Sequence, residues 1–288
     1  VSIARAPHPT GPFESHPANP VFSHRSTAHP VQNVGHADLV ERPDGTWAAV
    51  YLGVRPRGST PGYSPLGRET FVASIDWVDE WPAFRPSDTI PAAVPGFTDH
   101  FTGSALDPRW VAPAGDPADF ATPGPDVLRL TRVPDEGHRE LLCTRVRHES
   151  WRAEAAFDLT VGACRLVLRL NSRHWYEVQA DGEVVRVTAG VGPFVHTVAE
   201  APLPTRSVTL TLAAQAPADA GAPGANRGPD EVLLGYRTSG SATVLARLDG
   251  RYVTTEVAGR FTGRMIGVGA VDAAAHLQTF HYNPLEQD

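Results

Sequence analysis

Short apolar runs separated by turn-forming residues are the feature that most restricts the fold of this chain. Runs rich in valine, leucine, threonine and aromatic residues recur along the whole sequence, and glycine, proline, aspartate and asparagine interrupt them. Such runs are typical of β-strands. No long segment repeats its apolar residues with the period of an amphipathic helix. The pattern therefore predicts an all-β protein.

A proline-rich stretch divides the chain in two. The segment from Arg85 to Gly96 contains three prolines and separates two differently patterned parts. We therefore expect one domain over residues 1–90 and a second over residues 91–288. A chain of 288 residues is long enough for two ordinary domains, each with its own core.

The expected strands differ in number between the two domains. In the first we expect strands at His36–Glu41, Thr46–Gly53 and Glu69–Trp77, with Pro43-Asp44-Gly45 as a turn because proline presets φ and glycine accepts a positive φ. In the second, many short strands at close spacing predict a two-sheet antiparallel sandwich. These strands are Val127–Arg132, Arg152–Leu159, Arg165–Leu170, Trp175–Ala180, Glu183–Thr188, Ser207–Ala213, Glu231–Arg237 and Met265–Val271.

Charge and composition exclude several classes of function. The net charge is −7, and the 25 basic residues, all arginine, form no cluster, so nucleic acid is not an expected partner. No apolar run approaches the roughly 20 residues of a membrane span, so no membrane contact is expected. No GxSxG or HExxH motif is present. Cys143 and Cys164 are either buried thiols or one disulfide, and two cysteines are too few for a disulfide framework, which favours thiols.

Two segments of the first domain resemble a known family. GHADLVERPDGTWAAVYLGVRP from Gly35 and LGRETFVASIDWVDEWPAF from Leu66 resemble the last part of the five-bladed propeller of family 43 glycoside hydrolases, the β-xylosidases and α-L-arabinofuranosidases. In the second domain FTDHF, LDPRW, SRHWYEVQADG and RFTGRMIGVGAVD resemble the concanavalin-like sandwich of the xylosidases in that family. The resemblance implies an incomplete propeller, of about one blade plus a strand, followed by a concanavalin A-like antiparallel β-sandwich.

The resemblance also implies that this chain has no catalytic carboxylate. Val1–Arg5 is similar to the strand that follows the general-acid glutamate of the family, so the acid and the base are expected upstream of Val1. Asp38, Glu41, Glu69 and Asp76 are therefore not proposed as replacements, and we expect them to form structural ion pairs or turns. Without the carboxylates, the isolated chain is expected to be inactive, because an inverting glycosidase needs both an acid and a base.

His36 is the first candidate site residue. The histidine of the matching family segment faces the central channel of the propeller, where it meets a Ca²⁺ ion or its water. Imidazole can bind a metal or a metal-bound water, although Ca²⁺ prefers oxygen ligands. The alternative is a buried histidine that is hydrogen-bonded to a backbone carbonyl.

Arg68 and Phe261 are the candidates for binding substrate. The family arginine that matches Arg68 reaches the hydroxyls of the nonreducing-end sugar, and a guanidinium suits vicinal hydroxyls because its donors form a fixed fork. The alternative for Arg68 is an ion pair with Glu69 or Glu41. Phe261 matches a motif from which an aromatic ring enters the pocket and restricts it to short substrates. The alternative for Phe261 is an ordinary core phenylalanine.

Two functions follow from these observations. The first is part of a glycosidase that cleaves β-xylosidic or α-L-arabinofuranosidic bonds in xylo- or arabino-oligosaccharides by inversion, with an N-terminal propeller polypeptide as a partner that completes the fold. The second is a non-catalytic carbohydrate-binding or scaffold module. The low cysteine content and the resemblance lead us to expect a cytoplasmic protein, with secretion as the alternative.

Overall fold

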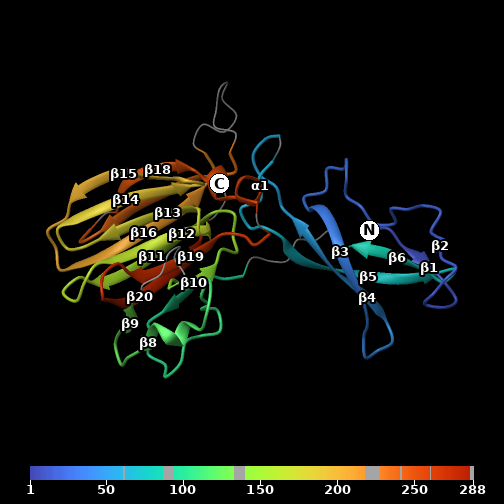
Figure 1. Ribbon diagram of the computed structural model, residues 1–288, viewed down its shortest axis with the longest axis horizontal. Coiled ribbons are helices and arrows are strands. Elements are labelled where there is room, and N and C mark those ends of the chain that lie inside the picture. Colours follow the sequence, from blue (N-terminus) through green and yellow to red (C-terminus); the bar gives the residue numbers. More distant parts are fainter. Residues whose placement is uncertain are drawn as a thin grey trace. The chain divides into compact units, whose positions relative to one another are not determined.

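The computed structural model of the 288-residue chain describes residues 1–60, 62–86, 94–132, 140–217, 228–240, 242–259 and 261–285. The chain forms two compact units. Unit 1 consists of Val1–Pro56 and Gly67–Ala92, and unit 2 of Arg57–Leu66 and Ala93–Asp288. Residues 57–66 lie within the first expected domain. In the structure they belong to unit 2, which also contains the second expected domain. Strands dominate both units (Figure 1), as the sequence pattern predicts.

Unit 1 is built on a four-stranded antiparallel sheet with the order β3-β4-β5-β6. Its strands are β3 (Gln32–Glu41), β4 (Trp47–Val54), β5 (Glu69–Val78) and β6 (Trp81–Pro86). The three expected strands are confirmed, and β6 extends to Pro86, which the sequence placed in the linker. Most of that linker, residues 87–93, lies outside the described residues. A separate pair, β1 (Ala4–Arg5) and β2 (Glu14–Ser15), contains the end of the expected N-terminal strand.

The turn between β3 and β4 forms where the sequence predicts it. Gly45 has φ +81°, a conformation that glycine adopts at little cost. The Gly45 N–H donates to the Arg42 carbonyl at 2.9 Å, and the Arg42 N–H donates to the Thr46 carbonyl at 2.8 Å. The Asp44 carboxylate accepts from both the backbone and the hydroxyl of Thr46. These contacts fix the hairpin and with it the register of the sheet.

The two faces of the unit 1 sheet differ in burial. One face packs Tyr51 and Ile75 against Phe22, whose ring stacks on that of Phe84 at a centroid distance of 4.9 Å. The other face carries Val50 and Val72, which are paired across β4 and β5 and are 37% and 51% exposed. Adjacent apolar side chains on an open face are what a propeller blade presents when no further blade covers it. The sheet is therefore a propeller remnant of about one blade.

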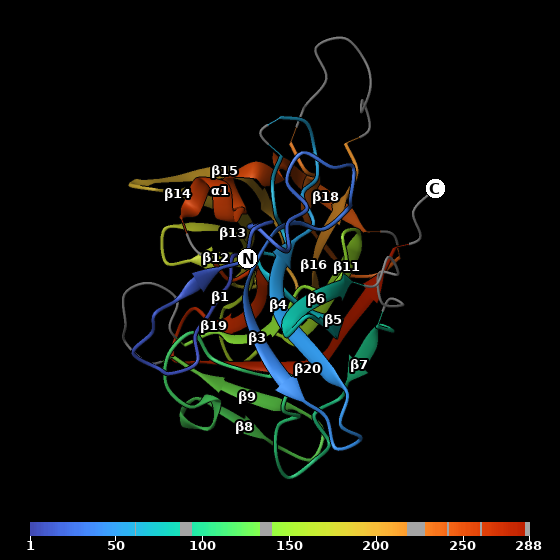
Figure 2. The ribbon, with the colours of Figure 1, turned by 90° about the vertical axis from the view of Figure 1, so that its right-hand side faces the viewer.

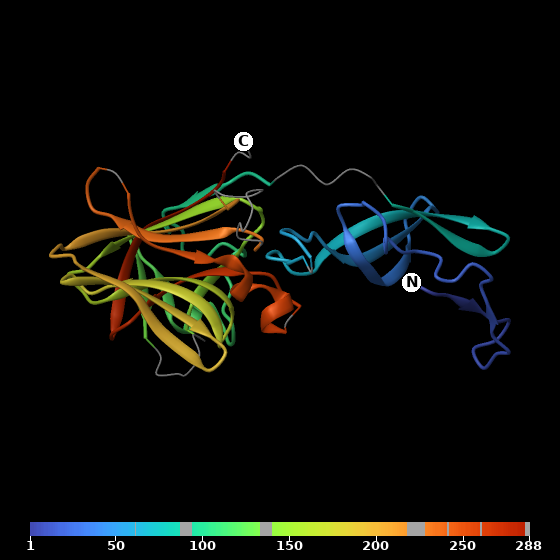
Figure 3. The ribbon, with the colours of Figure 1, turned by 90° about the horizontal axis from the view of Figure 1, so that it is seen from above.

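Unit 2 is a sandwich of two antiparallel sheets. The six-stranded sheet has the order β10-β19-β12-β13-β14-β15, and the eight-stranded sheet has β18-β17-β16-β11-β20-β9-β8, with β7 also paired to β20. Figure 3 shows the two layers, and Figure 2 shows β8, β9 and β20 side by side. The strands are β7 (Phe97–Asp99), β8 (Ala121–Pro123), β9 (Leu128–Thr131), β10 (Leu142–Arg145), β11 (Trp151–Asp158), β12 (Cys164–Asn171), β13 (His174–Ala180), β14 (Val184–Val191), β15 (Phe194–Pro202), β16 (Ser207–Gln215), β17 (Glu231–Arg237), β18 (Thr243–Asp249), β19 (Met265–Ala270) and β20 (Ala274–Pro284).

The helical elements of the described residues are short. They are the 3₁₀ turns η1 (Pro117–Asp119) and η2 (Gly250–Val253) and the single α-helical turn α1 (Thr255–Ala258). Gly259, with φ +67°, ends α1 in the left-handed conformation that commonly terminates helices. Within the described ranges, no helix has both the length and the apolar character needed to cross a membrane.

The core of unit 2 lies between the two sheets. Along β11 every second residue, from Trp151 to Phe157, is completely buried, as strand periodicity requires when one face meets the core. Cys164 lies in the same core and Cys143 in a smaller cluster beside Trp175. Both cysteines are free and buried, which confirms the expectation of thiols.

Candidate functional site

His36 lies at an irregularity of β3. Gly35 pairs with Leu52 and Asp38 with Val50, so that His36 and the next residue together face a single residue of β4. This is a β-bulge, and His36 has the left-handed φ of 53° that histidine tolerates better than most residues. Its side chain is exposed. A buried histidine bonded to a carbonyl, the alternative from the sequence, is therefore not what the structure contains.

A calcium ion needs more ligands than the described residues place around His36. Ca²⁺ takes roughly six to eight oxygen ligands. The described residues contain no group of three or more histidine, cysteine, aspartate or glutamate side chains that could hold a metal. A single imidazole on an exposed bulge does not make such a site, and His36 could contribute only one ligand, or a hydrogen bond to a bound water.

Arg68 lies directly before β5 and is half-buried. The neighbouring Gly67 has φ +66°, which turns the chain into the strand. Both carboxylate oxygens of Glu69 accept hydrogen bonds from Arg55, at 2.9 Å each, in a bidentate pair. Asp76 similarly pairs with Arg85 at 3.0 Å. These two ion pairs are the structural roles that we expected for Glu69 and Asp76.

Phe261 lies in the loop between α1 and β19 and is 70% exposed. It is therefore not a core phenylalanine, which was the alternative from the sequence. The loop is held three residues after Phe261, because the Arg264 N–H donates to the Pro65 carbonyl at 3.0 Å. The Val146 N–H donates in turn to the Arg264 carbonyl at 3.1 Å. Phe261 thus projects from a loop whose C-terminal end is fixed.

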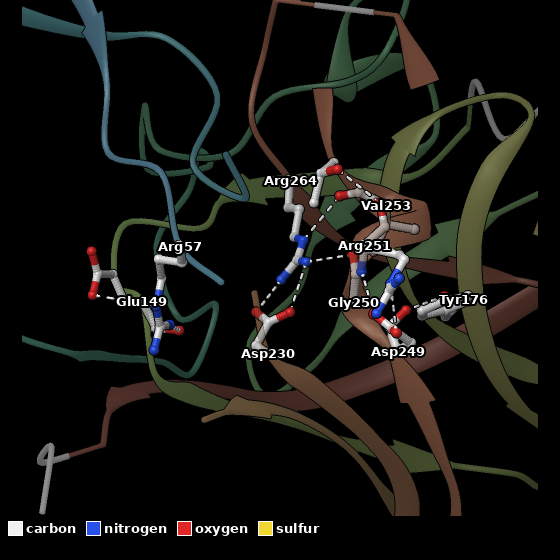
Figure 4. A network of polar contacts seen from close by, with 10 residues as sticks. Arg57, Glu149, Tyr176, Asp230, Asp249, Gly250, Arg251, Val253 and Arg264 are labelled. Atoms are coloured by element: carbon white, nitrogen blue, oxygen red, sulfur yellow. Dashed lines mark hydrogen bonds and ion pairs between the residues drawn. The ribbon is translucent and has the colours of Figure 1, made fainter. Parts of the chain in front are cut away.

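The Arg264 side chain is the centre of a buried polar network in unit 2 (Figure 4). Its guanidinium forms a bidentate ion pair with Asp230, and both side chains are completely buried. It also donates from Nε to the Val253 carbonyl at 3.0 Å and from Nη2 to the Gly250 carbonyl at 2.7 Å. No sequence pattern pointed to this pair, because Asp230 follows a glycine- and proline-rich stretch that reads as a loop.

The described residues between β4 and β5 that belong to unit 2, 57–60 and 62–66, contact the sandwich. Arg57 and Tyr63 exchange both backbone hydrogen bonds and close a small loop. The Arg57 guanidinium donates to the Glu149 carbonyl at 2.8 Å (Figure 4). The Ser64 N–H donates to the Glu256 carboxylate at 2.8 Å. Leu66 is part of the sandwich core and is 4% exposed.

Two surface hollows lined by described residues of the sandwich have volumes of about 440 and 330 Å³. The larger is lined by Phe97, Arg109, Arg147 and Tyr282, among others. The Arg109 guanidinium covers the ring of Phe97 at 4.2 Å from its centroid, and Tyr282 is 1% exposed. Neither ring thus presents an open face on which a sugar could stack.

Comparison with family models gives two matches in chain order. The model of glycosyl hydrolases family 43 matches residues 1–82. The model of the β-xylosidase C-terminal concanavalin A-like domain matches residues 98–283. The second match alone covers more than half of the 288 residues.

The alignments with curated relatives include a larger share of this chain than of the relatives themselves. A xylosidase/arabinosidase of Butyrivibrio fibrisolvens is 31% identical over 68% of this chain and 42% of its own length. A non-reducing end α-L-arabinofuranosidase of Bacteroides ovatus is 29% identical over 93% of this chain and 53% of its own. The chain thus spans about half the length of the curated relatives that it matches.

The structural neighbours agree with the observed architecture. A family 43 protein of Bacillus licheniformis superposes with a TM-score of 0.80 at 21% identity, over 99% of this chain and 60% of its own. A family 43 protein of Bacteroides ovatus gives a TM-score of 0.80 at 25% identity, over 98% and 60%. The fold of this chain is therefore the fold of about 60% of the length of such proteins.

Proposed function

Because the chain belongs to family 43 of the glycosyl hydrolases, we propose that it forms part of an enzyme that hydrolyses β-xylosidic or α-L-arabinofuranosidic bonds of xylan-derived oligosaccharides by inversion. The observation that supports this most is the order of the two matches, a propeller segment at residues 1–82 followed by the xylosidase sandwich at residues 98–283. We propose that residues 1–90 belong to the propeller and residues 91–288 to the sandwich, with residues 57–66 of the propeller segment held in the same compact unit as the sandwich. We also propose that the protein acts in the cytoplasm, on short oligosaccharides.

This chain supplies groups that bind the sugar rather than groups that transfer protons. Inversion needs an acid and a base about 6.5–9.5 Å apart, with room for a water between them. We propose that both lie on propeller segments outside residues 1–288. Arg68 donates hydrogen bonds to the hydroxyls of the nonreducing-end sugar, and the exposed ring of Phe261 bounds the pocket. His36 faces the propeller channel, where it contacts a bound ion or its water.

The partner of this chain is then the rest of the propeller. Val50 and Val72 expose an apolar face of the unit 1 sheet, and covering such a face is favourable because it removes apolar surface from water. A neighbouring blade is the partner whose shape fits a twisted four-stranded sheet. We propose that it is supplied by an N-terminal propeller segment, on the same or a separate polypeptide.

Hydrolysis of p-nitrophenyl β-xyloside and p-nitrophenyl α-L-arabinofuranoside tests the proposal. The 288-residue chain alone should show no turnover, because each missing proton-transfer group is worth roughly 10²–10⁴-fold in rate. The same chain within its full-length protein, or mixed with the N-terminal propeller segment, should hydrolyse at least one of the two substrates. Turnover by the isolated chain would show that it carries the carboxylates after all. Inactivity of the full-length protein on both would refute the assigned activity.

A non-catalytic carbohydrate-binding module is the other function that the sequence left open. The structure offers it less support, because Trp175 and Tyr176 are 9% and 2% exposed and belong to the interior. The rings at the larger hollow are covered by Arg109 or buried, as described above. Binding of xylo-oligosaccharides to the isolated chain, measured by calorimetry, would favour this second function if the full-length protein were inactive.

A further inference from the structure

Arg68 stands next to a carboxylate at the point where β5 begins. Arg68 lies in the bend before the strand, and Glu69 is the first residue of β5. Because Arg68 precedes the ladder, the alternation of a β-strand does not fix the side of the sheet to which its guanidinium points. A guanidinium and a carboxylate on neighbouring residues attract each other, and the sequence left their pairing open. An arginine in such a pair would be less available to a sugar.

The carboxylate of Glu69 is instead engaged by Arg55. Nε of Arg55 donates to Oε2 of Glu69 and Nη2 donates to Oε1, each at 2.9 Å. The two side chains are 18% and 28% exposed, so salt screens this pair less than a pair on an open surface. Bidentate pairs of arginine with a carboxylate are among the stronger ion pairs in proteins. Both oxygens of the carboxylate beside Arg68 are therefore occupied by a residue of unit 1.

The backbone that carries Glu69 is fixed by β4. Glu69 pairs with Gly53 in the β4–β5 ladder. A Cβ atom added to Gly53 would lie 2.5 Å from Cγ1 of Val31 and 3.3 Å from the ring of Phe71, so both side chains pack directly on the glycine backbone. Arg55 follows Gly53 by two residues on the same chain segment. The place of the Glu69 carboxylate relative to Arg55 is thus set by packing inside unit 1.

Glu41, the other carboxylate that the sequence offered to Arg68, lies at the opposite end of the sheet. Glu41 pairs with Trp47 at the start of β4, whereas Glu69 pairs with Gly53 near its end. From Trp47 to Gly53 the strand advances by roughly 20 Å, at about 3.3 Å per residue. An arginine side chain is too short to span that distance. Of these two carboxylates, Glu69 is therefore the one that can compete with a sugar for Arg68.

We propose that Arg55 is a positioning residue for Arg68. By occupying both oxygens of Glu69, Arg55 withholds that carboxylate from the neighbouring guanidinium, so that Arg68 can donate to the hydroxyls of the nonreducing-end sugar. This inference rests on the proposed function, since it assumes that Arg68 binds substrate. The role of Arg55 differs from a purely structural one, because it depends on the charge of Glu69 and disappears when that charge is removed.

The test measures kcat/KM of the full-length protein for the p-nitrophenyl glycoside that it hydrolyses. Arg55→Ala should lower kcat/KM about 10-fold to 100-fold, because displacing a binding group by about 1 Å has effects of that size. Glu69→Gln removes the competing charge and should stay close to wild type. The double variant Arg55→Ala/Glu69→Gln should recover most of the activity that Arg55→Ala loses. In an Arg68→Ala background, Arg55→Ala should cause almost no further loss.

A matched control and a second variant separate the proposed role from misfolding. The control is Arg85→Ala, which breaks the ion pair of Arg85 with Asp76 in the same sheet and should leave kcat/KM unchanged. Arg55→Met removes the charge but keeps most of the length of the side chain, and it should show the same loss and the same rescue by Glu69→Gln. If Arg55→Ala and Arg55→Met both failed to fold, Arg55→Met/Glu69→Gln would decide, because it leaves no carboxylate without its partner. That double variant should retain most of the wild-type kcat/KM, and a value as low as that of Arg68→Ala would contradict the inference.

The remaining outcomes distinguish this inference from the proposed function. Unchanged kcat/KM in Arg68→Ala would refute the role of Arg68, and both proposals would lose that residue. A loss in Arg68→Ala without a loss in Arg55→Ala would refute only the role of Arg55. If Arg55→Ala/Glu69→Gln were as impaired as Arg55→Ala alone, the ion pair would act by holding the fold, and the proposed role of Arg55 would be wrong.

Discussion

Arg264 and Asp230 form a bidentate ion pair with both side chains completely excluded from water. The pair joins the segment before β17 to the segment before β19, and the same guanidinium binds the carbonyls of Gly250 and Val253. Gly250 can only be glycine here, because an added Cβ would lie 1.7 Å from the Asp230 carboxylate. The loops next to Phe261 are therefore organised around one arginine.

Removal of one partner of this pair should destabilise the sandwich strongly. Asp230→Ala leaves the Arg264 charge buried without compensation, and we expect the free energy of unfolding to fall by about 3–5 kcal/mol. Urea denaturation of the 288-residue chain measures the loss. The control is Arg186→Ala, which breaks an ion pair with Glu200 at partly exposed side chains and should cost at most about 1 kcal/mol. A loss in Asp230→Ala no larger than in the control would contradict the structural role.

The strands could be read from the sequence, whereas the polar contacts that hold the loops could not. Strand residues such as those of β11 carry the alternation that one buried face imposes. The ion pair of Arg264 and the contact of Leu66 with Gly263 join residues 34 and about 200 positions apart, and no local periodicity encodes such a contact. For the same reason the sequence placed residues 57–66 with the propeller alone, although their backbone and the Leu66 side chain bind the sandwich.

The sequence also predicts some features of the turn and the candidate residues but not others. The turn at Gly45 follows from residue types alone. The left-handed conformation of His36 depends on how β3 pairs with β4, which the sequence of β3 does not specify. Exposure of Phe261 likewise follows from the path of the loop before Gly263. The resemblance to family motifs pointed to His36 and Phe261. It did not indicate the backbone conformation of His36 or the exposure of Phe261.

Tyr282 should stabilise the sandwich through its hydroxyl group. The hydroxyl accepts from the backbone N–H groups of Arg147 at 3.1 Å and His148 at 3.3 Å and lies 3.0 Å from Nδ1 of His148. Burial raises the pKa of this phenol to about 12. Tyr282→Phe leaves these buried groups without a partner, and we expect a loss of about 1–3 kcal/mol in the free energy of unfolding. Thermal unfolding tests this, with Tyr252→Phe as the control because Tyr252 is 43% exposed. Equal stability of the two variants would show that the hydroxyl contributes nothing.

The two thiols should be unreactive in the folded chain, even in mild alkali. Burial raises the pKa of Cys143 from 9.0 to about 12 and also raises that of Cys164. An exposed thiol is largely the reactive thiolate at pH 9.5, whereas these two stay protonated until the pH approaches their raised values. Titration with a chromogenic disulfide reagent at pH 9.5 should therefore detect no thiol in the native chain and two in urea. Rapid reaction of a native thiol would mean that its strand opens readily.

The last prediction separates the imidazole of His36 from its backbone conformation. His36 has φ 53°, so an ordinary substitution would add strain to the loss of the side chain. Asparagine tolerates this conformation, and His36→Asn should leave the melting temperature unchanged. If the imidazole contacts a channel ion or its water, the same variant should lower kcat/KM of the full-length protein about 10-fold, the lower end of the effect of removing a group beside a metal site.

A chelator completes this test. Removal of Ca²⁺ from the wild type should lower its kcat/KM toward that of His36→Asn, and the variant itself should respond little, because its contact to the ion is already lost. Asn33→Ala is the matched control, since Asn33 occupies the neighbouring bulge of β3 with φ 54°. It introduces the same backbone strain without removing an imidazole. If Asn33→Ala and His36→Ala lowered activity equally while His36→Asn kept wild-type activity, the left-handed backbone alone would matter, and the channel role of His36 would be wrong.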